Sequence, residues 1–115
     1  MERMSLQLKE IGVDVDSVIL RLGGNEAIYL TICDKFRYDQ NYQLFQTAIT
    51  ENDLHKAVFH IHTLKGIAAN LGFNRLEQIT SYIMENLKKN DLVALQHNIK
   101  DLTEEQKRLI NILDN

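Results

Sequence analysis

The sequence contains no proline and no tryptophan, and its 115 residues include only five glycines and one cysteine. Glycine and proline supply most tight-turn conformations, so their scarcity argues against a sheet with many hairpins and favours helices. A single cysteine excludes an internal disulfide, and its position in an apolar run predicts that Cys33 is a buried, reduced thiol, which suits the cytoplasm. No run of about 18 apolar residues and no signal-peptide pattern occurs, so we expect neither a membrane span nor secretion.

Basic residues are also fewer than acidic residues. Lys and Arg number 13 against 16 Asp and Glu, which gives a formal net charge of -3. Proteins that bind nucleic acid by neutralising its phosphates carry an excess of basic residues. We therefore expect no nucleic-acid partner.

The length and the hydrophobic content are those of one compact domain. The chain is 44% hydrophobic and 25% charged, and no linker or internal repeat interrupts it. A chain of this size can bury a sizeable core without disulfides or metals. We predict a single domain over residues 1–115.

Apolar residues recur at helical spacing along most of the chain, and Gly, Asn and Asp mark the interruptions. The predicted helices are Asp16 to Leu22, residues 25 or 26 to 50 with a bend or break over 37–42, 52–72 ending at Gly72, 74–90 capped by Asn74, and 91–113. Long helices joined by short turns pack as antiparallel neighbours. This predicts an all-α, up-and-down four-helix bundle with a short N-terminal helix capping one end.

Two of the predicted helices, 52–72 and 91–113, carry apolar stripes that we expect to form part of the core. On the helix 52–72 the stripe contains Leu54, Ala57, Val58, Ile61, Leu64, Ala68 and Leu71, and on the helix 91–113 it contains Leu92, Leu95, Ile99, Leu102, Leu109 and Leu113.

His62 lies away from the centre of its helix's stripe and toward solvent, with Gly66 one turn later on the same face. A glycine inside a helix costs about 0.5 to 1 kcal/mol relative to alanine, so Gly66 needs a reason. Helical side chains lean toward the N-terminus, so a side chain at position 66 would lie over the His62 ring, and glycine leaves the ring open. Lys65 leans the same way and suits an anion.

These three residues suggest a phosphoryl group carried on His62. A neutral imidazole is a competent nucleophile, and phosphoryl oxygens need charge-assisted donors such as Lys65. Taken alone, an exposed histidine without a function is the simpler interpretation.

Residues 62–72, with the sequence HTLKGIAANLG, strongly resemble the signature of histidine-containing phosphotransfer (HPt) domains. The resemblance extends back through residues 12–14 and 21–25 and forward through 76–85, so its core covers about 12–115. It implies a four-helix bundle whose exposed histidine accepts a phosphoryl group from a receiver-domain aspartate and passes it to another receiver. His62 aligns with that histidine, and Lys65 and Gly66 align with the basic residue and the glycine beside it.

The resemblance also implies the partners. These are response-regulator receiver domains of bacterial two-component systems, with a hybrid sensor histidine kinase as a further candidate. Receiver domains bring the acidic residues and the Mg²⁺, so we expect this chain to bind no cofactor and no metal itself. We expect the protein to be a cytoplasmic, monomeric carrier. A kinase is not expected, because the sequence contains no glycine-rich loop that could bind the phosphates of a nucleotide. A free-standing protein and a domain excised from a sensor kinase fit the sequence equally.

The partner surface should surround His62. Helical spacing places three apolar residues near it, namely Val58, Phe59 and Ala69. We expect Phe59 to be largely exposed, and its packing under a neighbouring helix is the alternative.

Met84 departs from the family pattern. By spacing it occupies the position where many members have a polar side chain, often Gln, that holds the histidine ring. A thioether cannot donate a hydrogen bond, so Gln78 and Ser81 are candidates to replace that contact.

A helical interaction module that binds receiver or kinase domains without being phosphorylated is the alternative function. The presence of His62, Lys65 and Gly66 together favours the carrier. Of the other histidines, His55 shares the face of His62 and is interpreted as a solvated residue, and His60 points away from His62. His97 is given no role, and no spacing of His and Cys predicts a metal site.

Overall fold

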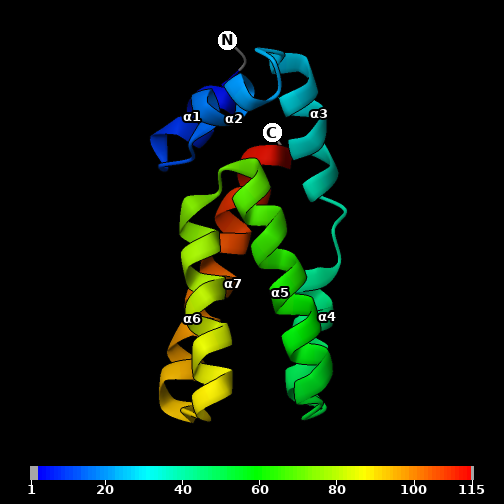
Figure 1. The fold of residues 1–115 in the computed structure, drawn as a ribbon, viewed down its shortest axis with the longest axis vertical. Coiled ribbons are helices and arrows are strands. Elements are labelled where there is room, and N and C mark those ends of the chain that lie inside the picture. The colour runs from blue at the N-terminus through cyan, green and yellow to red at the C-terminus, as the bar shows by residue number, and fades with distance from the viewer. Residues whose placement is uncertain (1–2, 115) are drawn as a thin grey trace.

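The computed structural model describes residues 3–114, in which seven α-helices and no β-strand occur. Figure 1 shows the later helices of the chain side by side and the earlier helices gathered at one end of them. The first three are α1 (Arg3–Glu10), α2 (Val15–Arg21) and α3 (Glu26–Phe36), and the last four are α4 (Asn41–Thr50), α5 (Leu54–Leu71), α6 (Asn74–Lys89) and α7 (Leu92–Asp114).

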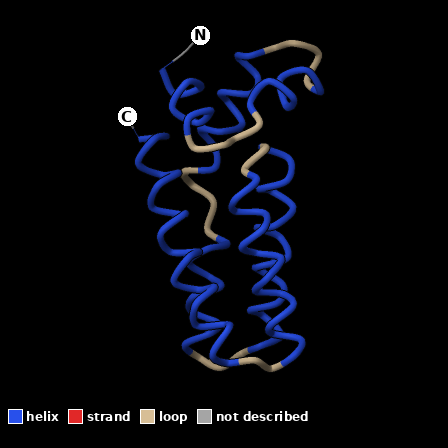
Figure 2. The backbone as a smooth tube through the Cα atoms, turned by 90° about the vertical axis from the view of Figure 1, so that its left-hand side faces the viewer, coloured by secondary structure: helices blue, strands red, loops and turns tan. Residues whose placement is uncertain are grey.

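Helices α4 to α7 form an up-and-down bundle, as the sequence predicts (Figure 2). α5 packs against both α4 and α6, and α6 packs against α7. The contact between α4 and α7 includes polar side chains: the Tyr42 hydroxyl donates to Thr103 Oγ1 over 3.0 Å, and Gln46 Nε2 donates to the same oxygen over 3.2 Å. The largest fully buried side chains of the core include Tyr29, Phe45, Phe73, Leu8, Ile61, Leu64, Leu76, Ile79, Ile83, Leu102 and Leu109.

Side chains and left-handed residues define the helix ends. Asp53 accepts a hydrogen bond from the backbone N–H of Lys56 at the start of α5. Gly72 ends α5 in the left-handed conformation with φ of 75°, as predicted. The predicted cap at Asn74 is wrong, because Phe73 is the N-cap of α6 and Asn74 Nδ2 donates instead to the Gly12 carbonyl oxygen over 3.3 Å.

Helices α1–α3, here called the N-terminal cap, are attached to the C-terminal end of α5. The buried Tyr29 hydroxyl donates to the Leu71 carbonyl oxygen over 3.0 Å, and the Asp14 N–H donates to the Gly72 carbonyl oxygen over 3.0 Å. The rings of Phe36 and Phe73 meet edge to face with centroids 5.2 Å apart. Backbone carbonyls that a helix end leaves unsatisfied thus become the attachment points of the cap.

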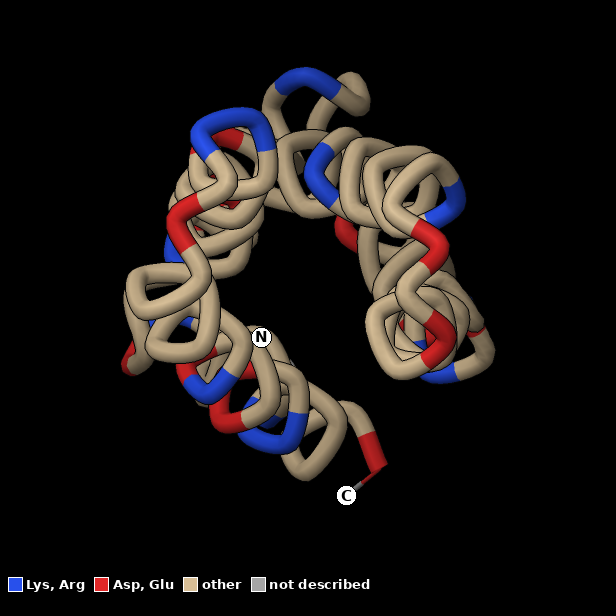
Figure 3. The backbone as a smooth tube through the Cα atoms, turned by 90° about the horizontal axis from the view of Figure 1, so that it is seen from below, with Lys and Arg blue, Asp and Glu red and all other residues tan. Residues whose placement is uncertain are grey.

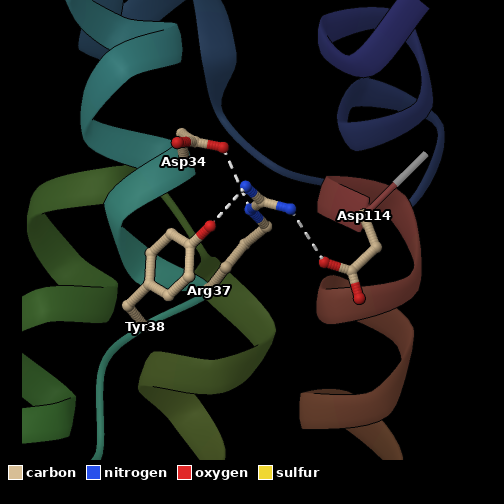
Figure 4. A network of polar contacts seen from close by, with 4 residues as sticks. All are labelled: Asp34, Arg37, Tyr38 and Asp114. Carbon is tan, nitrogen blue, oxygen red and sulfur yellow. Dashed lines mark hydrogen bonds and ion pairs between the residues drawn. The ribbon is translucent and has the colours of Figure 1, made fainter.

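The predicted break between α3 and α4 is present, and Arg37 lies within it (Figure 4). Its Nε is 3.0 Å from Asp34 Oδ1, and its Nη1 donates to Asp114 Oδ1 at the end of α7 over 3.2 Å. Its Nη2 donates to the Tyr38 hydroxyl over 2.9 Å. One guanidinium therefore joins the break between α3 and α4 to the last turn of α7.

Several sequence expectations need correction. The sequence did not predict α1, whose apolar side chains are few and which is stabilised by packing against α7 and α2. α2 begins and ends one residue earlier than predicted. Leu54, Val58 and Leu92, expected in the core, are 47%, 43% and 62% exposed. Leu54 and Leu92 are the first residues of α5 and α7, where the end of the bundle leaves one side of each uncovered.

Cys33 is a fully buried, free thiol, as the sequence predicted. Burial raises the pKa of this thiol to about 11, so it stays protonated at neutral pH.

The outside of the bundle carries both signs of charge. Figure 3 shows Lys and Arg interspersed with Asp and Glu around the bundle, and neither sign is confined to one side. Within residues 3–114, every helix falls short of the length and apolarity that a membrane crossing requires.

The contact at Gly72 yields a stability prediction. A Cβ atom at this residue would lie 2.8 Å from Val18 Cγ2 and 3.0 Å from the Asp14 carbonyl oxygen. Gly72→Ala should therefore lower the free energy of unfolding by about 2 to 3 kcal/mol, through backbone strain plus displacement of α2. Urea denaturation measures this loss.

Gly24 is the matched control, because its φ is +82° and a Cβ there would meet nothing within 4 Å. Gly24→Ala should cost only the backbone strain, about 1 kcal/mol. Equal losses in the two variants would show that the close approach of α2 contributes nothing.

Candidate functional site

The candidate site lies on α5. The residues that this helix buries in the core determine which of its other residues face the solvent. Five residues at helical spacing are at most 2% exposed: Ala57, Ile61, Leu64, Ala68 and Leu71. His62 and Gly66 lie on the opposite side and are exposed, while Lys65 and Ala69 are half-buried. The structure therefore brings the predicted site residues together on one face of a single helix.

The side chains of His62 and Lys65 are available to a ligand. Among residues 3–114, neither takes part in a hydrogen bond or an ion pair. Because Lys65 follows His62 by three residues, the two side chains share one side of the helix. An exposed imidazole therefore has a cationic group beside it that no carboxylate neutralises.

Gly66 has open space beside it. A Cβ atom at this position would meet no atom within 4 Å outside the local backbone. Its conformation is helical, so neither strain nor packing within the described chain requires glycine here. The surface of α5 is therefore open at this position, one turn after His62.

Phe59 is 63% exposed, which confirms the predicted exposure and excludes its packing under a neighbouring helix. Its ring meets the ring of His60 edge to face, with centroids 5.1 Å apart and an interplanar angle of 82°. Val58, one turn before His62, is 43% exposed. Two apolar side chains thus lie at the surface within one turn of the histidine.

Met84 lies close to this part of α5. It lines a pocket of about 350 Å³ between α5 and α6, together with Val58, Glu85, Leu87 and Lys88. Met84 therefore shares a pocket with Val58, which lies one turn before His62.

Neither candidate replacement for a ring-holding side chain bonds to His62. Gln78 Nε2 donates to the Tyr82 hydroxyl over 3.2 Å, and Ser81 Oγ donates to the Glu77 carbonyl oxygen over 3.0 Å. The His62 ring is therefore not oriented by α6 in the way proposed from the sequence.

The other histidines differ in their surroundings. His55 and His97 are exposed. His60 is half-buried, and its Nδ1 is 3.0 Å from Asn41 Oδ1 on α4, so it faces away from the site as predicted. Sequence reasoning did not identify the contact with Asn41. In residues 3–114, no group of three or more His, Cys, Asp or Glu side chains is arranged to hold a metal ion.

The bundle and its exposed histidine agree with a known family. The sequence model described as Hpt domain matches residues 38–114. This chain belongs to the Hpt domain family. The match covers α4 to α7 and starts after α3, so it contains the whole of α5 and its site residues. Searches of the curated proteins and of the solved structures gave no match.

Membership defines the general role of the chain. Hpt domains take part in histidine phosphotransfer within phosphorelays, where they interact with receiver domains and histidine kinases. They are phosphoryl carriers and have no kinase activity of their own.

Proposed function

We propose that this Hpt domain is a phosphorelay intermediate in which His62 accepts a phosphoryl group from a receiver-domain aspartate and passes it to another receiver. The observation that carries the proposal is the face of α5 described above. It presents an exposed imidazole, an ammonium group and a glycine, in a chain whose bundle matches the Hpt family.

The chemistry is a displacement at phosphorus. A ring nitrogen of neutral His62 attacks the phosphorus of an aspartyl phosphate, and the bond from phosphorus to the carboxylate oxygen breaks. The electron pair of that bond stays on the carboxylate, and the other ring nitrogen keeps its proton. Transfer to the second receiver is the reverse step on a new aspartate, so no oxidant or reductant is required.

Lys65 and Gly66 support this step in different ways. The Lys65 ammonium offsets the negative charge of the phosphoryl oxygens with charge-assisted hydrogen bonds. Gly66 leaves space for the phosphoryl group and for the partner that delivers it. Because α5 is a regular helix packed between α4 and α6, the backbone positions that carry these groups are set before the partner arrives.

The receiver domains supply the remaining chemistry. We propose that they bring the Mg²⁺ and the acidic residues that polarise the phosphoryl group. Val58, Phe59 and Ala69 lie on the side of α5 that carries His62 and would contact the receiver.

The direct test mixes the protein with a phosphorylated receiver domain and Mg²⁺ and measures phosphate bound to this chain. The wild type should acquire acid-labile, base-stable phosphate, and His62→Gln should acquire none. His55→Gln is the matched control, because His55 is an exposed histidine on the same helix, and it should behave like the wild type.

Two results would contradict the proposal. No label from several receivers would favour a non-phosphorylated interaction module, and label that persists in His62→Gln would place the phosphoryl group on another residue.

Gly66→Leu separates clearance from stability. The variant should be at least as stable as the wild type, because leucine favours a helix by roughly 0.5 to 1 kcal/mol over glycine and the position is open. Phosphoryl acceptance should fall by about 10-fold or more, because the new side chain lies over His62. Urea denaturation and the transfer assay measure the two effects, and unchanged transfer would contradict the clearance role.

Lys65→Ala tests the electrostatic role. Loss of one charge-assisted contact should slow phosphoryl transfer by about 10-fold, and thermal unfolding should change little because Lys65 has no ion pair within residues 3–114. An equal rate would show that the receiver or the solvent supplies the positive charge. Lys56→Ala, which changes another lysine of α5, controls for the loss of general charge.

A further inference from the structure

A chain of polar contacts leads from the break between α3 and α4 to α5. Asp39 Oδ1 accepts the backbone N–H of Asn41 over 2.9 Å, at the start of α4. The Asn41 amide nitrogen Nδ2 donates to both Asp39 oxygens, over 3.0 and 3.2 Å. On its other side, Asn41 Oδ1 is 3.0 Å from His60 Nδ1. All three side chains are half-buried.

The direction of these hydrogen bonds follows from what each group can do. A carboxylate only accepts, so the Asn41 amide nitrogen must face Asp39. The amide oxygen then faces His60, and because this oxygen also only accepts, His60 Nδ1 must carry the proton. The neutral His60 ring is therefore fixed in its Nδ1–H tautomer, and Nε2 has the lone pair.

The oriented His60 ring in turn contacts Phe59. The two rings meet edge to face at 5.1 Å, although Phe59 is 63% exposed and extends from the surface. An exposed phenylalanine without such a contact samples several rotamers and loses that freedom when a partner binds. The edge-to-face contact with His60 therefore favours one orientation of the exposed Phe59 ring. His62 follows three residues later and remains uncovered.

We propose that His60, oriented by Asn41 and Asp39, is a positioning residue that presents the ring of Phe59 as an anchor for the incoming receiver domain. The identity of the partner rests on the proposed function, whereas the positioning rests on the contacts above. The anchor fits an apolar pocket on the receiver, because aromatic side chains that are already ordered bind at low entropic cost.

The tautomer of His60 is tested first, without any partner. Long-range proton–nitrogen spectra of the histidine rings, recorded at mildly alkaline pH, should show a protonated Nδ1 for His60 in the wild type. Asn41→Ala should lose this preference, whereas Gln43→Ala, an exposed neighbour on α4, should keep it. A His60 ring protonated at Nε2 in the wild type would overturn the proposal.

Receiver binding is tested with a double-mutant cycle. Titration calorimetry with a receiver domain that binds the wild-type protein compares the wild type, Asn41→Ala, Phe59→Ala and the double variant. Phe59→Ala should weaken binding about 10-fold and Asn41→Ala about threefold. The double variant should bind no more weakly than Phe59→Ala, because Asn41 acts through the ring that is no longer there.

Additive losses, about 30-fold in the double variant, would overturn the positioning role, because a merely structural effect of Asn41 does not depend on Phe59. Thermal unfolding of each variant verifies that α4 and α5 remain folded. If the proposed function is wrong, the result is different: the binding losses of Asn41→Ala and Phe59→Ala are not additive, but His62 acquires no phosphate. Failure of the positioning leaves phosphorylation of His62 intact and makes the losses additive.

Discussion

The rotation of α5 about its own axis is the constraint on which the rest of the structure depends. Its buried face, centred on Ile61 and Leu64, packs between α4 and α6 and excludes water completely. Turning the helix to bury His62 would expose these two side chains, at a cost of about 2 kcal/mol or more for each. The core of the bundle therefore fixes which residues of α5 face the solvent, and the site needs no separate scaffold.

The C-terminal end of α5 sets a second condition, because the N-terminal cap is attached there. The carbonyl groups of Leu71 and Gly72 accept hydrogen bonds from α3 and from the start of α2. Gly72 permits the close approach because it has no Cβ atom. Arg37 also joins Asp34 of α3 to Asp114 of α7. The N-terminal cap is therefore attached both to the end of α5 and to the end of α7.

Helical periodicity predicted the bundle, the break near Arg37 and the exposure of His62, because each depends on local spacing and on residue type. It did not predict α1, which is stabilised by contacts with α7 and α2, nor the start of α6 after Phe73, where the Asn74 side chain donates to the Gly12 carbonyl oxygen instead of capping the helix. The link from Asn41 to His60 was missed for the same reason, since the two residues meet only when α4 packs on α5. The spacing of residues within one helix shows which of them share a face, but contacts between helices can be identified only from the folded structure.

The central claim is that the phosphoryl group resides on His62 and on no other histidine of the chain. Mass spectrometry of the wild-type protein, digested at alkaline pH after incubation with a phosphorylated receiver domain, tests it most directly. The account predicts phosphate on the peptide that contains His62, with fragment ions that assign it to this ring. Phosphate on His55, His60 or His97, or on no histidine, would contradict the account.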